Sequence, residues 1–273
     1  MTSQGTSSDH QEVLLTDAMA EAGRKLFAQQ LSKMQSYEEG SRTGEDIESV
    51  HQMRVATRRM RSLFKLVGSH YTPKTVKKYN RGLRDIARAL GLIRDVDVLI
   101  LDLQEFQITR DEDTQTAIDS IIQKLDKQRH KHRIRLNALF DSGRYAKFNR
   151  QFGKFTAKSG RGAIIIDSDE LPHQVRHVLP IILHECLATV RAYETVLDDA
   201  EDEVLHALRV EFKQLRYAVE FFKPVLGASA DNFIKAVNLM QDLLGRINDI
   251  AVFCDRMNRV KRLSKNQQAA VDS

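Results

Sequence analysis

Apolar side chains recur at steps of three and four residues along most of this chain, which is the spacing of one face of an α-helix. In the segment 50–67 this stripe consists of Val50, Met53, Thr57, Met60, Phe64 and Val67. The alternation typical of strands is nearly absent, and the chain has only four prolines. The pattern therefore predicts an all-α protein, with helices near residues 11–38, 46–69, 74–91, 96–107, 113–140, 172–198, 202–223, 230–245 and 249–263.

A basic row runs beside the apolar stripe of this segment, about 100° further around the predicted helix. It consists of His51, Arg54, Arg58, Arg61 and Lys65. Like charges three or four residues apart destabilise an isolated helix, so such a row costs free energy unless an anion offsets the repulsion. The row therefore indicates an anion-binding surface.

The next predicted helix carries another basic row at the same spacing. It consists of Lys74, Lys77, Arg81, Arg84 and Arg88. From His51 to Arg94 the chain has twelve Lys and Arg and a single acid, Asp85, whereas the whole chain has a net charge of only +5. A basic block in an otherwise slightly acidic protein is typical of a site for a polyanion.

The basic row and its apolar stripe occur a second time, 155 residues further on. The repeated row consists of His206, Arg209, Lys213 and Arg216. A second block, Gly91 and Asp95, returns as Gly245 and Asp249 at an offset of 154. Two blocks in the same order at nearly one offset indicate two copies of one helical unit. The 74–88 row has no such copy, since its counterparts include two acids. Either the first half binds the anion more strongly, which we expect, or the 74–88 row lies outside the binding surface.

The repeated pattern H-x-x-R-V-x-x-[RK]-x-x-R, followed by G-x-x-x-D, resembles the CHAD family, the conserved histidine α-helical domain. The resemblance covers about residues 10–265. It implies two pseudo-symmetric antiparallel four-helix-bundle halves around a basic central cleft. It also implies binding of inorganic polyphosphate and an association with polyphosphate granules. We expect disordered ends at 1–9 and 266–273, a first half at 10–158, a linker at 159–171 and a second half at 172–265.

The expected polyphosphate-binding residues are the members of the three rows. They are His51, Arg54, Arg58, Arg61, Lys65, Lys74, Lys77, Arg81, Arg84, Arg88, His206, Arg209, Lys213 and Arg216. Arginine offers planar pairs of donors to phosphate oxygens and keeps its charge at all relevant pH values. A row of ten residues spans about 15 Å of helix, which suits a linear polymer. A bound anion favours protonation of the two histidines, so binding should strengthen as the pH falls.

The alternative to each of these interpretations is structural. Basic rows on helices are commonly solvated faces. Asp95, Asp97 and Asp249 could hold a cation that bridges to phosphate, but they are better explained as helix caps or as partners of arginines. The positions three and four residues after His51 and His206 hold arginine and valine, which does not suit a metal. We therefore expect no metal and no cofactor, although His173 and His177 form an (i, i+4) pair.

Catalysis and nucleic-acid recognition are the two competing functions. The sequence has no Walker loop, no G-x-S-x-G and no repeated acidic motif, so we expect a noncatalytic binder. It has no tryptophan, and its phenylalanines lie largely on buried helix faces, so it offers few aromatic rings on which bases could stack. Its local positive charge still permits nonspecific nucleic-acid binding, which is the alternative function. The chain has only two cysteines, and its polar start lacks signal-peptide character. It also has no long apolar window. We therefore expect a cytoplasmic protein that does not cross a membrane. A polyphosphate-metabolising enzyme is a second candidate partner.

Overall fold

The computed structural model describes residues 12–166, 172–198 and 200–247. These residues are almost entirely helical, with only two isolated β-bridges among them, which confirms the all-α prediction. The chain divides into two compact units, Met1–Val175 and Arg176–Ser273. Within the described ranges, no helix has the length and apolar character needed to span a membrane.

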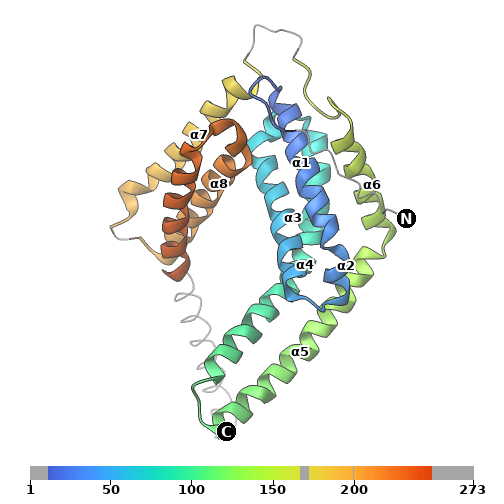
Figure 1. Cartoon of the computed structure of the whole chain (residues 1–273), viewed down its shortest axis with the longest axis vertical. Helices are drawn as coiled ribbons and strands as arrows, with labels where there is room; N and C mark the ends of the chain where they lie inside the picture. Colours follow the sequence, from blue (N-terminus) through green and yellow to red (C-terminus); the bar gives the residue numbers. More distant parts are fainter. Residues whose placement is uncertain (1–11, 167–171, 199, 248–273) are drawn as a thin grey trace, which may run out of the picture. The chain divides into compact units, whose positions relative to one another are not determined.

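The first unit contains six α-helices among its described residues (Figure 1). They are α1 (Met19–Ser36), α2 (Glu38–Thr43), α3 (Ile47–Val67), α4 (Pro73–Gln107), α5 (Glu112–Phe140) and α6 (Gly143–Ala157), with a short 3₁₀ helix, η1 (Gly68–His70), after α3. The carboxylate of Asp46 caps α3 by accepting a hydrogen bond from the Glu48 backbone N–H. Pro73 occupies the first helical position of α4, where its missing N–H costs nothing. Helix α3 packs against both α1 and α4, and α4 also packs against α5 and α6.

The core of the first unit is a cluster of aromatic rings from α1, α3 and α6. The rings of Phe27 and Phe64 lie 4.2 Å apart, and Phe152 and Phe155 pack around them. The whole predicted apolar stripe of α3 is buried in this core, which confirms that prediction. Burial of the stripe fixes the rotation of α3, so its basic row lies along the edge of the core.

The start of the expected linker is held against the first unit. The Thr72 N–H donates to the Gly162 carbonyl at 2.9 Å, and the Ile164 N–H donates to the His70 carbonyl at 2.9 Å. Gly162 has φ +74°, a left-handed conformation that glycine adopts without strain. The segment that contains Gly162 and Ile164 therefore runs alongside the junction between η1 and α4.

The second unit has a smaller described core. Its helices are α7 (Val175–Arg191), α8 (Asp202–Leu226) and a helical segment over 229–247, with a 3₁₀ helix, η2 (Ala192–Val196), between the first two. One cluster of buried core residues consists of Val190, Leu208, Leu215, Val237 and Leu244. Leu208 and Leu215 belong to the apolar stripe predicted for α8.

Two predicted helices proved to be one, and another helix was missed. The prediction of separate helices at 74–91 and 96–107 was wrong, because α4 is continuous through Gly91. Leu90, Ile93 and Val96 continue its buried face, and this burial outweighs the low helix propensity of one glycine. Helix α6 was not predicted, although its N-cap Ser142 and its aromatic residues at steps of three and four are typical helix signals.

Several predictions fall on residues that the structure does not describe. They are the ends 1–9 and 266–273, the later part of the linker, the helix at 249–263 and Asp249.

Candidate functional site

Five predicted arginines from two helices line one groove in the first unit. Its lining residues are Arg54, Arg58, Arg61, Arg84, Ala87 and Arg88, and we call it the α3–α4 groove. Among the residues described, Arg61, Arg84 and Arg88 form no ion pair with a carboxylate. The single acid of the basic block, Asp85, pairs with Arg144 of α6. Because Asp85 pairs with Arg144, it does not neutralise the arginines of the groove. The groove therefore concentrates positive charge.

His51 lies one helical turn before Arg54 and is half-buried. Its burial lowers the pKa of the imidazole below the ordinary value, and Arg94, Arg58 and Arg54 lower it further, while Glu48 opposes them. The charge of Arg94, which was not among the predicted site residues, is the largest of these Coulomb effects. His51 therefore lies in a positive field, and an anion in that field would favour its protonation.

Arg54 lies close to the backbone of α4 at a glycine. A Cβ atom added to Gly91 would lie 3.7 Å from the Arg54 Nε. In the second unit, a Cβ atom added to Gly245 would lie 3.8 Å from an Nη of Arg209. The two sequence blocks that repeat along the chain are thus in contact within each unit, in the same way.

The second row lies on α8. His206 is exposed, and Arg209, Lys213 and Arg216 are half-buried. Arg216 donates a hydrogen bond of 3.1 Å to Glu220, and its guanidinium lies 5.0 Å from the centre of the Tyr217 ring. Part of the charge of this row is therefore balanced within its own helix, unlike the charge of Arg61, the equivalent residue in the first unit.

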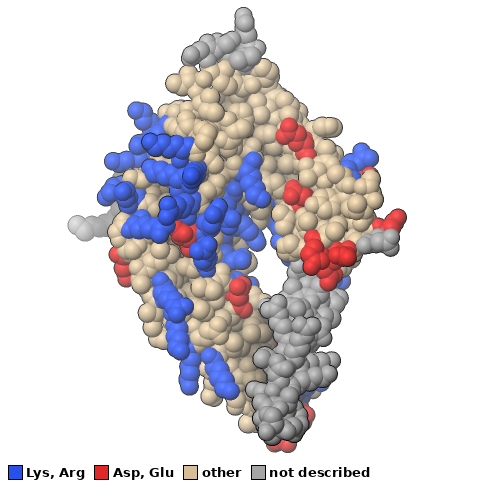
Figure 2. All heavy atoms as spheres, turned by 180° about the vertical axis from the view of Figure 1, so that it is seen from behind, with Lys and Arg blue, Asp and Glu red and all other residues tan. Residues whose placement is uncertain are grey.

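The remaining predicted residues do not line the α3–α4 groove. Lys65, Lys74 and Lys77 are exposed. Arg81 lines a second groove, between α4 and α6, together with residues that sequence reasoning missed: Lys78, Arg144 and Lys147. Lys78 directly follows Lys77 of the predicted row, and the two α6 residues were missed because their helix was not predicted. Figure 2 shows Lys and Arg side chains gathered over one face of the first unit, with few acidic side chains among them.

The described ranges contain no group of three or more His, Cys, Asp and Glu that could hold a metal ion. Asp97 is buried, and its Oδ1 lies 3.6 Å from Arg129 Nη1. Burial raises the pKa of Asp97, although Arg129, Arg94 and Arg133 act to lower it. The Asp97–Arg129 ion pair links α4 to α5.

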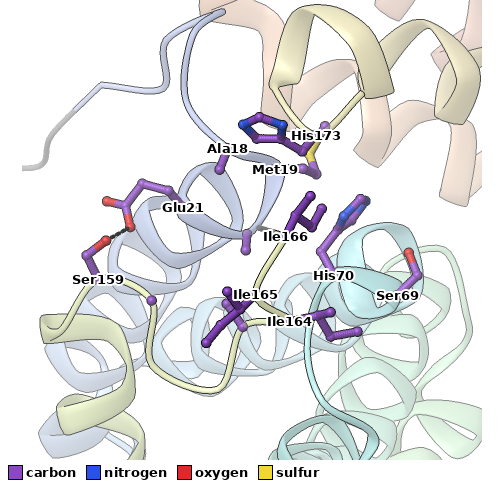
Figure 3. A pocket seen from close by; sticks show the side chains of 13 residues that line it. Ala18, Met19, Glu21, Ser69, His70, Ser159, Ile164, Ile165, Ile166 and His173 are labelled. Carbon is purple, nitrogen blue, oxygen red and sulfur yellow. Dashed lines mark hydrogen bonds between the residues drawn. The ribbon is translucent and has the colours of Figure 1, made fainter. Parts of the chain in front are cut away.

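A second kind of pocket lies elsewhere in the first unit (Figure 3). Ile164, Ile165 and Ile166 contribute to it, and His70 and His173 lie beside them. Ser159 donates a hydrogen bond of 2.8 Å to Glu21 at its edge. No Lys or Arg is among its lining residues, so its chemistry does not suit a polyanion.

The chain is similar in sequence to two curated proteins. Two uncharacterized proteins from two strains of Mycobacterium tuberculosis are each 26% identical to the chain over 212 residues, which is 75% of this chain and 39% of theirs. The chain thus spans about two fifths of the length of these curated relatives.

Two solved structures are similar to it. The crystal structure of the CHAD domain from the plant Ricinus communis superposes with a TM-score of 0.72 at 24% identity, covering 94% of this chain and 85% of that one. PptA from Streptomyces chartreusis gives a TM-score of 0.57 at 12% identity, covering 81% of each chain. The family model for the CHAD domain matches residues 25–258. Since that match takes in most of the chain, the protein belongs to the CHAD domain family.

Proposed function

We propose that this protein binds inorganic polyphosphate and catalyses no reaction on it. The observation that carries the proposal is the α3–α4 groove, where five arginines from two helices line one depression. Guanidinium groups bind phosphate oxygens through paired hydrogen bonds, and they remain charged over the whole physiological pH range. A ligand with many adjacent phosphates is the chemical complement of such a surface.

The length of the groove favours a polymer over a single phosphate. Arg54 and Arg61 are seven residues apart, or about 10 Å along α3, and inclusion of His51 extends the row to about 15 Å. One phosphate contacts only a part of this length. A linear chain of phosphates contacts all of it and releases counterions along the whole row.

The second row, on α8, belongs to the same proposal. His206, Arg209, Lys213 and Arg216 repeat the sequence of the α3 row, and the Arg209–Gly245 contact repeats the Arg54–Gly91 contact. These repeats support two pseudo-symmetric helical halves whose rows bind the same class of anion.

A binding role without catalysis fits the chemistry of the groove. Phosphoryl transfer needs carboxylates that hold Mg²⁺ beside the phosphates, and the lining of the α3–α4 groove contains none. We place the protein in the cytoplasm, at polyphosphate granules, where a polyphosphate-metabolising enzyme is its candidate partner.

A competition experiment separates this function from its alternative, nonspecific nucleic-acid binding. Labelled long-chain polyphosphate is bound to the protein at near-physiological salt and is displaced by unlabelled polyphosphate or by single-stranded RNA of equal total charge. We expect polyphosphate to compete more strongly, since the groove offers cations rather than surfaces on which bases stack. Preferential displacement by RNA would reject the proposal.

A double variant tests the residues. Arg54→Ala combined with Arg209→Ala should keep its helical circular dichroism spectrum and lose most of its affinity for polyphosphate. The matched control is Lys124→Ala with Lys127→Ala, which removes two exposed charges from α5. Equal affinities of the two double variants would show that the α3 and α8 rows are not the site.

A further inference from the structure

The second groove lies on the other side of α4 from the first. Its cationic residues are Lys78 and Arg81 from α4 and Arg144 and Lys147 from α6, and we call it the α4–α6 groove. Tyr79, Gly82, Phe148 and Gln151 complete its lining. Its lining residues on α4 are more than sixty residues away in the sequence from those on α6.

Gly82 and Phe148 form the floor of this groove. A Cβ atom at Gly82 would lie only 2.3 Å from the Phe148 ring, so this ring lies directly on the backbone of α4. Phe148 also stacks on the fully buried Phe152, at 5.4 Å between ring centres. The groove is therefore anchored to the core, and its cations stand on two rigid helices.

The charge of the α4–α6 groove is only partly balanced. Arg144 pairs with Asp85. In the part of the chain that the structure describes, Lys78, Arg81 and Lys147 form no ion pair with a carboxylate. Partial burial lowers the pKa of Lys78, and the charges of Arg161, Lys147 and Lys74 lower it further. Several cations thus converge on Lys78, and a bound anion would relieve their repulsion.

Helical geometry connects the two grooves. Arg81 and Arg88 are seven residues apart, so they lie within about 20° of each other on the outer face of α4, about 10 Å apart along its axis. Relative to Arg81, Arg84 is rotated about 60° toward the α3–α4 groove, and Lys78 about 60° toward the α4–α6 groove. The outer face of α4 is therefore a ridge of cations between two cationic grooves, on the basic face seen in Figure 2.

We propose that the α4–α6 groove is a second binding segment for polyphosphate, and that a long polymer crosses the ridge of α4 to occupy both grooves at once. This inference rests on the proposed function. It assigns Lys78, Arg81, Arg144 and Lys147 a role in binding long chains, whereas a short chain occupies the α3–α4 groove alone.

The experiment compares tripolyphosphate with long-chain polyphosphate on the full chain. The test variant is Lys78→Ala with Lys147→Ala, the contrasting variant is Arg58→Ala with Arg88→Ala, and the control is Lys124→Ala with Lys127→Ala. All four proteins, including the wild type, are checked by circular dichroism. Dissociation constants are then measured by isothermal titration calorimetry at several salt concentrations.

We expect the test variant to lose about tenfold in affinity for the long chain and less than twofold for tripolyphosphate. Its slope of log affinity against log salt for the long chain should be shallower by about 1.4, or about 0.7 for each lost phosphate contact on a single-stranded polyanion. The contrasting variant should lose affinity for both ligands, and the control for neither.

The outcomes distinguish the two proposals. A wild type that binds neither ligand would reject the proposed function, and this inference with it. A wild type that binds the long chain, with a test variant indistinguishable from the control, would reject the second groove alone. An equal loss of both ligands in the test variant would also reject it, because the two grooves would not be separate segments.

Discussion

Arg54 shows how a charged side chain is held beside a buried helix face. It is half-buried, it lies one position after the fully buried Met53, and it extends over Gly91 of the neighbouring helix. An arginine stem packs well on apolar surface while its guanidinium remains at the edge. Such a side chain loses less freedom on binding than a solvated lysine, because packing has already restricted it. The α3 row is therefore better organised for phosphate than the exposed Lys65, Lys74 and Lys77.

His51 makes the affinity for polyphosphate depend on pH. Without a bound anion its pKa lies below the ordinary value of a histidine, because of burial and the charges of Arg94, Arg58 and Arg54. A bound polyanion offsets these charges and raises the pKa, so binding takes up a proton. Affinity should rise as the pH falls through the bound-state pKa and level off below the empty-state pKa. Titrations of polyphosphate between pH 8 and pH 5 measure this rise.

The control for this prediction is His51→Asn, which keeps a polar group and removes the titration. The variant should show a smaller rise in affinity over the same range of pH. An unchanged pH profile would mean that His51 does not respond to the anion.

At the scale of secondary-structure elements, α4 is the helix on which both grooves depend. Its buried residues Leu83, Ile86, Leu90 and Ile93 face the core, and this orients the cations on its outer face. Helix α6 approaches it closely at Gly82, where the Phe148 ring occupies the space that a side chain would need. The packing of α6 on α4 should therefore be sensitive to the addition of a single methyl group at Gly82.

Gly82→Ala should destabilise the protein by about 1 kcal/mol or more, since the new methyl group overlaps the Phe148 ring and overpacking outweighs the gain in helix propensity. The matched control is Gly153→Ala in α6, where an added Cβ atom meets nothing within 4 Å. The control should stabilise the protein by up to about 1 kcal/mol. Urea unfolding followed by circular dichroism measures both changes, and a Gly82→Ala variant as stable as the control would contradict the close contact.

For the whole molecule, the uneven distribution of charge matters more than the net charge of +5. The basic block lies in the first unit, over α3 and α4, and α6 adds further cations beside it. In the second unit, Arg216 is paired with Glu220 and Lys223 with Asp231. We therefore expect the first unit to supply most of the electrostatic free energy of binding.

Salt should weaken polyphosphate binding steeply. If the five arginines of the α3–α4 groove each neutralise one phosphate, this groove contributes about −3.5 to the slope of log affinity against log salt, taking the value for single-stranded polyanions. From this groove alone, affinity should fall about a hundredfold between 50 and 200 mM salt. Fluorescence anisotropy with labelled long-chain polyphosphate, repeated over a series of NaCl concentrations, measures the slope. A slope near zero would show that binding does not depend on these ion pairs.

The sequence by itself determined the helical class, the buried stripe of α3 and the basic row beside it, because a 3.6-residue period places apolar and charged positions on defined faces of one helix. It also brought out the repeated blocks around Arg54 and Arg209, which resemble the CHAD family. The tertiary structure alone decided that α4 continues through Gly91, since burial of Leu90, Ile93 and Val96 outweighs local propensity. It alone divided the α4 row between two grooves and brought Arg144 and Lys147 to Lys78, because contacts between distant segments depend on how helices pack and not on the periodicity of any one of them.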